Sequence, residues 1–389
     1  MTKWEKKVYK ISDFDDLEDY MSAISSAKFK NFHNNRTSTD AYQQLKTNLE
    51  PTQENVVSGA MLTEINNSIS KLKSEIDGAK TNEEKEIILQ RFLSSDHVLF
   101  LNDHGSNHID KVIEKAFEIL KNINFTVPLN EFEIFILLCA IQIHDIGNVY
   151  GRVEHEKNLS SIFETACNNI IIDTPEKRVI KNIAMMHGGK NKNGNKDTIS
   201  ALCSVEEICG MTIRTRLLAA VLRFADELSD DCTRANRVAL DLNLLGINSE
   251  IYHKYSQVLH TVNIEKDSDN QDYHILLVYE LEAKMLSVEY DMGNTKKFLL
   301  DEIYDRTLKV EQERRYCMKF MCPFINIGRI IVKINIYDDN SYQIDKISYC
   351  LEDTTYPDKP LIGNITEIQN DVPSGIEELR KIREKGVKI

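Results

Sequence analysis

An almost unbroken apolar run ends in a histidine and an aspartate: Ile134-Phe-Ile-Leu-Leu-Cys-Ala-Ile-Gln-Ile143 is followed by His144 and Asp145. A helix built from this run is apolar on every side, so we expect it inside the protein and not on its surface. Asn130 precedes the run as a plausible N-cap, and Gly147 follows it as a stop. An imidazole and a carboxylate are thus delivered into the interior, where a buried charge needs a partner.

Three other helical stretches carry a histidine or an aspartate at an edge. His108 lies at the start of one, His187 at the end of another, and Asp226 beside the apolar stripe of a third. Imidazole nitrogens and carboxylate oxygens that meet at one point are ligands for a divalent cation such as Mn, Fe, Zn, Co or Mg. We therefore predict a metal site made by His108, His144, Asp145 and Asp226.

Composition narrows the class of protein. The chain has 389 residues, enough for two or three domains, and its formal charge of −13 argues against bulk binding to nucleic acid or to an anionic membrane. No window approaches the ~20 uncharged apolar residues of a membrane span, and the start has no signal-peptide core. The eight cysteines form no C-x-x-C pair and are expected to be reduced. We expect a cytoplasmic protein.

The hydrophobic pattern changes along the chain and predicts four segments. Residues 1–54 are polar and are expected to be weakly structured or peripheral, whereas residues 55–240 have the spacing of amphipathic helices. Residues 241–370 mix strand-like runs with one helix, and residues 371–389 form a charged helix. The fold class is therefore a mainly α-helical domain followed by a smaller α+β region.

The order of the four ligand candidates resembles the HD superfamily of metal-dependent phosphohydrolases, over about residues 91–240. Two stretches carry the likeness: His144-Asp-Ile-Gly147 has the family's His-Asp-Ile-Gly form, and Leu222-Arg-Phe-Ala-Asp-Glu-Leu228 is similar to its late helix. The resemblance implies an all-α domain whose histidines and aspartates bind a divalent metal that activates water against phosphorus. A metal lowers the pKa of bound water from about 15.7 to about 7, which makes this chemistry possible at neutral pH.

A finer likeness points to the HD-type domains of bacterial conflict systems. It rests on Asp103-His-Gly-Ser-Asn-His108, on His144-Asp-Ile-Gly-Asn148 with Arg152 and His155, and on Glu311-Gln-Glu-Arg-Arg-Tyr-Cys317. This branch implies a bacterial protein in antiviral defence, with an Hsp90-like ATPase or another conflict-system protein as a partner. The present sequence shows no ATP-binding module, so the fusion to such an ATPase does not carry over.

The remaining site candidates are expected to act on the substrate or to hold a second cation. We predict three catalytic residues, Asp145, His187 and Arg152, the last of which neutralises phosphate charge. A second metal ion or substrate contacts would use His155, His187 and His104, with Asp145 bridging two ions. One ion is the simpler expectation.

Simpler explanations exist for single residues. Asp226 could be a surface carboxylate paired with Arg223 or Arg234. His187 precedes two glycines and could merely place a cation at the C-terminus of a helix.

The function that these residues favour is hydrolysis of a small phosphate ester, foremost a nucleotide, by metal-activated water. Two alternatives stay open. One is a regulatory module that binds a nucleotide without turning it over. The other is an HD-type nuclease, which the acidic charge and the lack of a basic, aromatic-rich stripe make the weaker alternative.

Overall fold

A computed structural model describes most of the chain. The described residues are 10–24, 37–54, 67, 70–94, 105–122, 128–150, 155–167, 170, 173–191, 193–208, 210–235, 240, 247–267, 273–292, 295–352, 364–369 and 371–387. They form two compact units, each assembled from separated stretches of sequence. The first comprises residues 1–56, 104–229 and 317–326, and the second comprises residues 57–103, 230–316 and 327–389.

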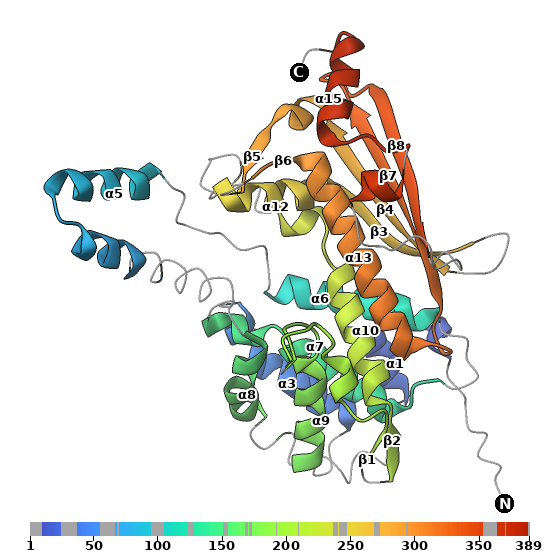
Figure 1. The fold of residues 1–389 in the computed structure, drawn as a ribbon. Helices are drawn as coiled ribbons and strands as arrows, with labels where there is room; N and C mark the ends of the chain where they lie inside the picture. The colour runs from blue at the N-terminus through green and yellow to red at the C-terminus, as the bar shows by residue number, and fades with distance from the viewer. Residues whose placement is uncertain are drawn as a thin grey trace, which may run out of the picture. The chain divides into compact units, whose positions relative to one another are not determined.

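The first unit is helical (Figure 1). Its longer helices are α1 (Leu17–Ile24), α3 (Ser38–Gln53), α6 (Ser106–Lys121), α7 (Glu131–Ile143), α8 (His155–Ala166), α9 (Thr174–Met185) and α10 (Thr215–Leu228). Short elements connect them: η1 (Ile11–Asp13), η2 (Ile146–Tyr150), η3 (Ile199–Ala201) and a hairpin of β1 (Glu206–Ile208) with β2 (Met211–Ile213).

Helix α7 lies at the centre of this unit. Every residue from Phe132 to Ile143 is buried, and α1, α3, α6, α9 and α10 pack around it. Its first turn is closed by the predicted cap, because the Asn130 side chain accepts from the backbone N–H of Glu133 at 2.9 Å. The predicted interior helix is therefore confirmed.

One described segment is long and apolar enough to cross a membrane, although Glu131, Glu133 and Asp145 interrupt it. Among the described residues, Glu131–Tyr150 meets that test by length and composition, with a mean hydropathy of 1.5. However, 94% of the apolar 18-residue window within this segment is buried inside the protein. A core helix needs the same apolar composition because protein surrounds it in place of lipid.

The described part of the N-terminal segment, residues 10–24 and 37–54, is not peripheral, contrary to the sequence-based expectation. Leu17 of α1 and Leu45 of α3 are fully buried. A buried polar chain also ties α3 to α7, since Gln142 Nε2 donates to the Tyr42 hydroxyl at 2.8 Å and Gln53 Nε2 donates to the Gln142 carbonyl at 2.7 Å. In α1 and α3 themselves, the buried side chains form a narrow, mostly apolar stripe on each helix, and the polar composition around it hides this stripe in the sequence.

Glu176, in the first turn of α9, is a buried carboxyl group with 1% exposure. Burial, and to a smaller extent the charge of Asp173, raises its pKa from 4.5 to about 8. Because the folded protein favours protonated Glu176, this group stabilises the fold fully below its unfolded-state pKa. That stabilisation is lost as pH rises from the unfolded-state pKa through the folded-state pKa.

We therefore expect Glu176→Gln to stabilise the protein near neutral pH. At about 1.4 kcal/mol per pH unit above the unfolded pKa, the gain over wild type at pH 7 is on the order of 3 kcal/mol. It should shrink toward zero near pH 4.5. Urea unfolding of both proteins at several pH values measures this difference, and a gain that does not change with pH would contradict the assignment.

The second unit is built on a four-stranded sheet with the order β3-β4-β7-β8. The strands are β3 (Leu259–Lys266), β4 (Tyr273–Glu282), β7 (Ile327–Tyr337) and β8 (Gln343–Glu352). The central pair, β4 and β7, is parallel, and the two outer pairs are antiparallel. A parallel pair needs a long crossover, and α13 (Leu299–Met321) supplies it. The other elements are α5 (Asn82–Ser94), η4 (Cys232–Arg234), α12 (Ile247–Val258), η5 (Ala283–Ser287), β5 (Glu289–Asp291), β6 (Lys296–Phe298), α14 (Ile365–Ile368) and α15 (Gly375–Glu384).

Helix α13 packs on one face of the sheet, where alternate residues of β7 are buried. A hydrogen bond of 2.7 Å joins Thr307 to the hydroxyl of Tyr349. The stretch 311–317, noted above for its resemblance, forms part of this contact. Arg314 donates to the Glu311 carboxylate at 2.7 and 2.8 Å and to the Ile327 carbonyl at the start of β7 at 2.8 Å. In the folded protein this stretch joins α13 to the sheet.

The predicted fold class, a mainly helical domain followed by a smaller α+β region, is confirmed. The division of the chain differs from the predicted boundaries at 54, 240 and 370. Residues 317–326 and the N-terminal helices pack with the first unit, and α15 packs with the second. Packing brings together segments distant in sequence, and hydrophobic periodicity carries no information on such pairings.

Candidate metal centre

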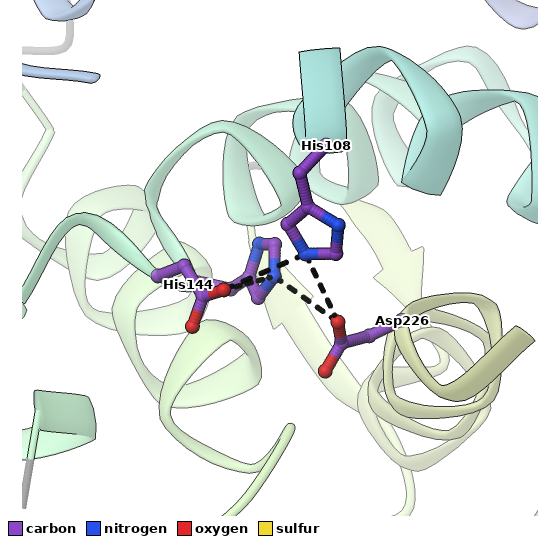
Figure 2. A group of neighbouring side chains, drawn as sticks. His108, His144 and Asp226 are labelled. Carbon is purple, nitrogen blue, oxygen red and sulfur yellow. Dashed lines mark ion pairs between the residues drawn. The ribbon is translucent and has the colours of Figure 1, made fainter. Parts of the chain in front are cut away.

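Three helices of the first unit bring four ligand candidates together. His108 lies in the first turn of α6, His144 ends α7 with Asp145 directly after it, and Asp226 lies in the last turn of α10. Figure 2 shows the side chains of His108, His144 and Asp226 pointing toward one another. Both imidazoles are fully buried, whereas the Asp226 side chain is 26% exposed. The cluster therefore has a protein side and a solvent side.

The distances within this first cluster are those of metal ligands. Nε2 of His108 lies 3.2 Å from Asp226 Oδ1 and 3.5 Å from Asp145 Oδ2, and Nε2 of His144 lies 3.6 and 3.5 Å from the same two oxygens. Charge-assisted N–H···O bonds are shorter, at about 2.7–2.9 Å. Atoms that share one ion at about 2.0–2.2 Å and tetrahedral or octahedral angles are separated by roughly 2.8–3.6 Å.

Hydrogen bonds on the far side of each imidazole aim its Nε2 lone pair into the cluster. The Nδ1–H of His144 donates to the Ile141 carbonyl at 2.8 Å. Ser229 donates its hydroxyl proton to the Asp226 carbonyl at 2.7 Å, so Ser229 can only accept from Nδ1–H of His108, 3.2 Å away. Nε2 of His144 is buried and has no hydrogen-bond partner among the described residues. A cation satisfies such an atom, because metal-binding histidines are held by their other ring nitrogen.

A second cluster adjoins the first through Asp145. Oδ1 of Asp145 lies 3.2 Å from Nε2 of His155 and 3.5 Å from Nε2 of His187, and the two Nε2 atoms are 3.1 Å apart. His187 is oriented like His144, since its Nδ1–H donates to the Ala184 carbonyl at 2.7 Å. Asp145 thus turns Oδ2 toward the first cluster and Oδ1 toward the second, as a carboxylate that bridges two ions would.

The electrostatics of the first cluster favour an ionised carboxylate. Burial by itself raises the pKa of Asp226, but the neighbouring His108 and His144 outweigh burial and hold this pKa well below its usual range. The ligand must be deprotonated to hold a cation, and here it is deprotonated throughout the physiological range. The residues present therefore fit a divalent metal ion.

Comparison with known proteins identifies the family to which this chain belongs. The HD-CE family matches residues 96–308, more than half of the chain. The chain belongs to the HD-CE family. Neither the curated proteins nor the solved structures that were compared include a match. The resemblance to HD-type domains is thus confirmed, and the HD-CE match spans every residue of both clusters.

Six of the predicted site residues meet at the HD-CE centre. They are His108, His144, Asp145, His155, His187 and Asp226. Two others, His104 and Arg152, lie outside the described residues.

The alternative ion pairs of Asp226 with Arg223 or Arg234 do not form, because both arginines bind other groups. Arg223 donates to the Lys196 carbonyl at 3.2 Å and to Thr198 Oγ1 at 3.1 Å, and Arg234 lies 3.9 Å from Asp230. Asp226 instead faces the histidines. His187 is 7% exposed and turned into the second cluster, which a solvated helix-end charge would not be.

Sequence reasoning missed Ser229, the residue that orients His108. Its signal is weak, since it consists only of a hydroxyl one helical turn after Asp226. We expect Ser229→Ala to weaken metal binding by about 10–100-fold, the usual cost of losing a residue that orients a ligand histidine. Titration of the metal-free protein with Mn²⁺ measures this change. Equal affinities for Ser229→Ala and wild type would show that the hydroxyl does not orient His108.

Proposed function

We propose that this HD-CE protein is a metal-dependent phosphohydrolase. The observation that carries the proposal is the shared carboxylate of Asp145, which faces two histidine pairs through its two oxygens. In this proposal His108, His144, Asp145 and Asp226 hold one divalent ion. His155, His187 and Asp145 hold a second ion or contact the substrate phosphate.

The divalent metal would supply a Lewis acid that makes water nucleophilic at neutral pH and polarises a phosphoryl oxygen. The chain's own residues do the positioning. Among the described residues, the imidazoles of His108 and His144 lie on the buried side of the centre, and the partly exposed Asp226 and His155 lie where substrate can reach it. In the one-ion form of the proposal, His187, fixed by the Ala184 carbonyl, exchanges a proton at Nε2 with the reacting groups, whereas in the two-ion form the same Nε2 binds the second ion.

A small phosphorylated molecule, foremost a nucleotide, is the substrate we propose. Two divalent ions with two carboxylates leave a net positive centre, which attracts a phosphate group. The protein as a whole carries a formal charge of −13, which repels a long polyanion. These charges support a short substrate held locally, in preference to the nuclease alternative.

The cellular setting is proposed from resemblance. The stretches around His108 and at residues 311–317 support a bacterial protein in antiviral defence. A cytoplasmic location is proposed from the composition, in which 28% of the residues are charged. The same likeness supports an Hsp90-like ATPase as a partner.

The proposal is tested by metal analysis of the purified protein, followed by phosphate-release assays. The substrates are nucleoside mono-, di- and triphosphates, cyclic nucleotides, and single-stranded DNA and RNA, with Mn²⁺, Mg²⁺, Co²⁺ or Ni²⁺ added in turn. We expect bound metal, and turnover of a nucleotide with a shallow salt dependence, because few phosphates are contacted.

Three results would redirect the proposal. Bound metal with nucleotide affinity but no turnover would favour the regulatory module. Strand cleavage with a steep salt dependence would favour the nuclease. Protein that takes up no metal at all would overturn the metal-dependent mechanism in every form.

A further inference from the structure

Gly147 makes an unusually close backbone contact. It lies in η2, directly after the His144-Asp145 pair, and η2 packs against α8. A Cβ atom placed on Gly147 would lie 1.9 Å from the carbonyl oxygen of His155 and 3.2 Å from the backbone nitrogen of Leu159. Both are backbone atoms, so no side-chain rotation relieves the clash. Only glycine allows the two segments to approach this closely.

The glycine is required for space and not for backbone conformation. Gly189 and Gly194 have positive φ values of 72° and 80°, whereas Gly147 is not among the residues with positive φ. Its expected role as a helix stop therefore does not explain why the position needs glycine. The neighbour that a side chain would strike does explain it, because that neighbour is the backbone of His155.

The same contact fixes where the His155 side chain lies. His155 is the first residue of α8, and its Nε2 reaches Asp145 at 3.2 Å and His187 at 3.1 Å. Leu159, one turn further along α8, is fully buried, and α8 as a whole packs against η2. His108, His144 and Asp226 come from α6, the end of α7 and α10, none of which begins at this contact, whereas Asp145 precedes Gly147 by two residues and belongs to both clusters.

We propose that the backbone contact between Gly147 and α8 is the positioning device of the second cluster. A side chain at residue 147 pushes α8 outward and withdraws His155 from Asp145 and His187. The first cluster keeps His108, His144 and Asp226 in place. This inference rests on the proposed function, since it assigns Gly147 to the second of the two ion sites.

The test compares Gly147→Ala with Gly188→Ala. Gly188 is the matched control because it adjoins His187, because a methyl group placed on it would meet no atom within 4 Å, and because its φ is not positive. Each protein is titrated with Mn²⁺ and examined by electron paramagnetic resonance, which separates a coupled ion pair from a single ion. We expect a coupled pair in wild type and Gly188→Ala, and a single ion in Gly147→Ala, with affinity for the second ion lowered at least 10-fold.

Leu159→Ala supplies a second arm should Gly147→Ala fail to fold. It keeps the glycine but removes a fully buried side chain of α8 one turn after His155, which loosens the packing of α8, so it too should weaken the second ion more than the first. A coupled pair with unchanged affinities in either folded variant would overturn the inference alone. Fewer than two ions in wild type would overturn both the inference and the two-ion form of the proposed function. Two ions without turnover would overturn the proposed activity and leave the inference standing.

Discussion

Asp145→Asn is expected to remove bound metal and to abolish turnover while the helices stay folded. Asparagine keeps the size of the side chain but lacks the charge that faces four imidazoles at 3.2–3.5 Å. Because both clusters use this one carboxylate, its loss reaches both ion sites. We expect turnover to fall by more than about 10³-fold, beyond the roughly 10²–10³-fold cost of losing a single stabilising group.

The matched control for this variant is Asp110→Asn. Asp110 lies two residues after His108, but its side chain is 65% exposed and its ion pair with Lys46 spans 3.7 Å. Such surface pairs contribute little, so metal content and rate should match wild type. Metal analysis, circular dichroism and rate are measured on both variants. A normal metal content in Asp145→Asn would remove this residue from the centre.

His187→Ala is expected to lower turnover by roughly 10²–10⁴-fold, the range for losing a positioned acid-base group. Its side chain is only 4% exposed and its Nε2 faces Asp145 and His155. The first cluster contains no atom of His187, so the ion held there should remain. The alternative, a helix-terminal charge, is worth about 0.3–1 kcal/mol of stability and predicts a normal rate.

His260→Ala is the control for removing a histidine, because His260 is exposed on β3 of the second unit. Melting temperature, metal content and rate on the two variants separate the explanations. A slightly lower melting temperature with an unchanged rate in His187→Ala would assign His187 to the helix end only.

The helix that carries His144 and Asp145 could be predicted because its signal is local. An apolar run of this length has one stable place in a globular protein, and the residues at its end must follow it there. Asp226 and His108 could be proposed for the same reason, since each lies beside an apolar stripe. The 3.2 Å distance between His108 Nε2 and Asp226 Oδ1 depends on tertiary packing. The order of the family's motifs predicts this proximity, but helix periodicity does not.

Three other features of the centre and of the fold have no signal in the local sequence. Ser229 acts through one hydroxyl oxygen, which accepts from His108 Nδ1–H while the hydroxyl proton goes to the Asp226 carbonyl, and composition does not reveal this role. The space requirement at Gly147 depends on where α8 packs, and a glycine after a helix already has an ordinary explanation. The parallel pairing of β4 and β7 joins strands separated by a whole helix, so no short-range pattern specifies it.

The buried hydrogen bonds from Gln53 and Tyr42 to Gln142 show that the helical unit needs residues outside the stretch matched by the HD-CE family. The HD-CE match begins at residue 96, yet Gln142, two residues before His144, is fully buried and finds its partners on α3. A fragment cut at the start of the match would leave that amide without those partners, at about 1–3 kcal/mol for each unsatisfied buried group, and would uncover the core face of α7. We therefore expect residues 96–308, which the HD-CE family matches, not to fold stably without α1 and α3. A minimal version of this centre has to begin upstream of α1.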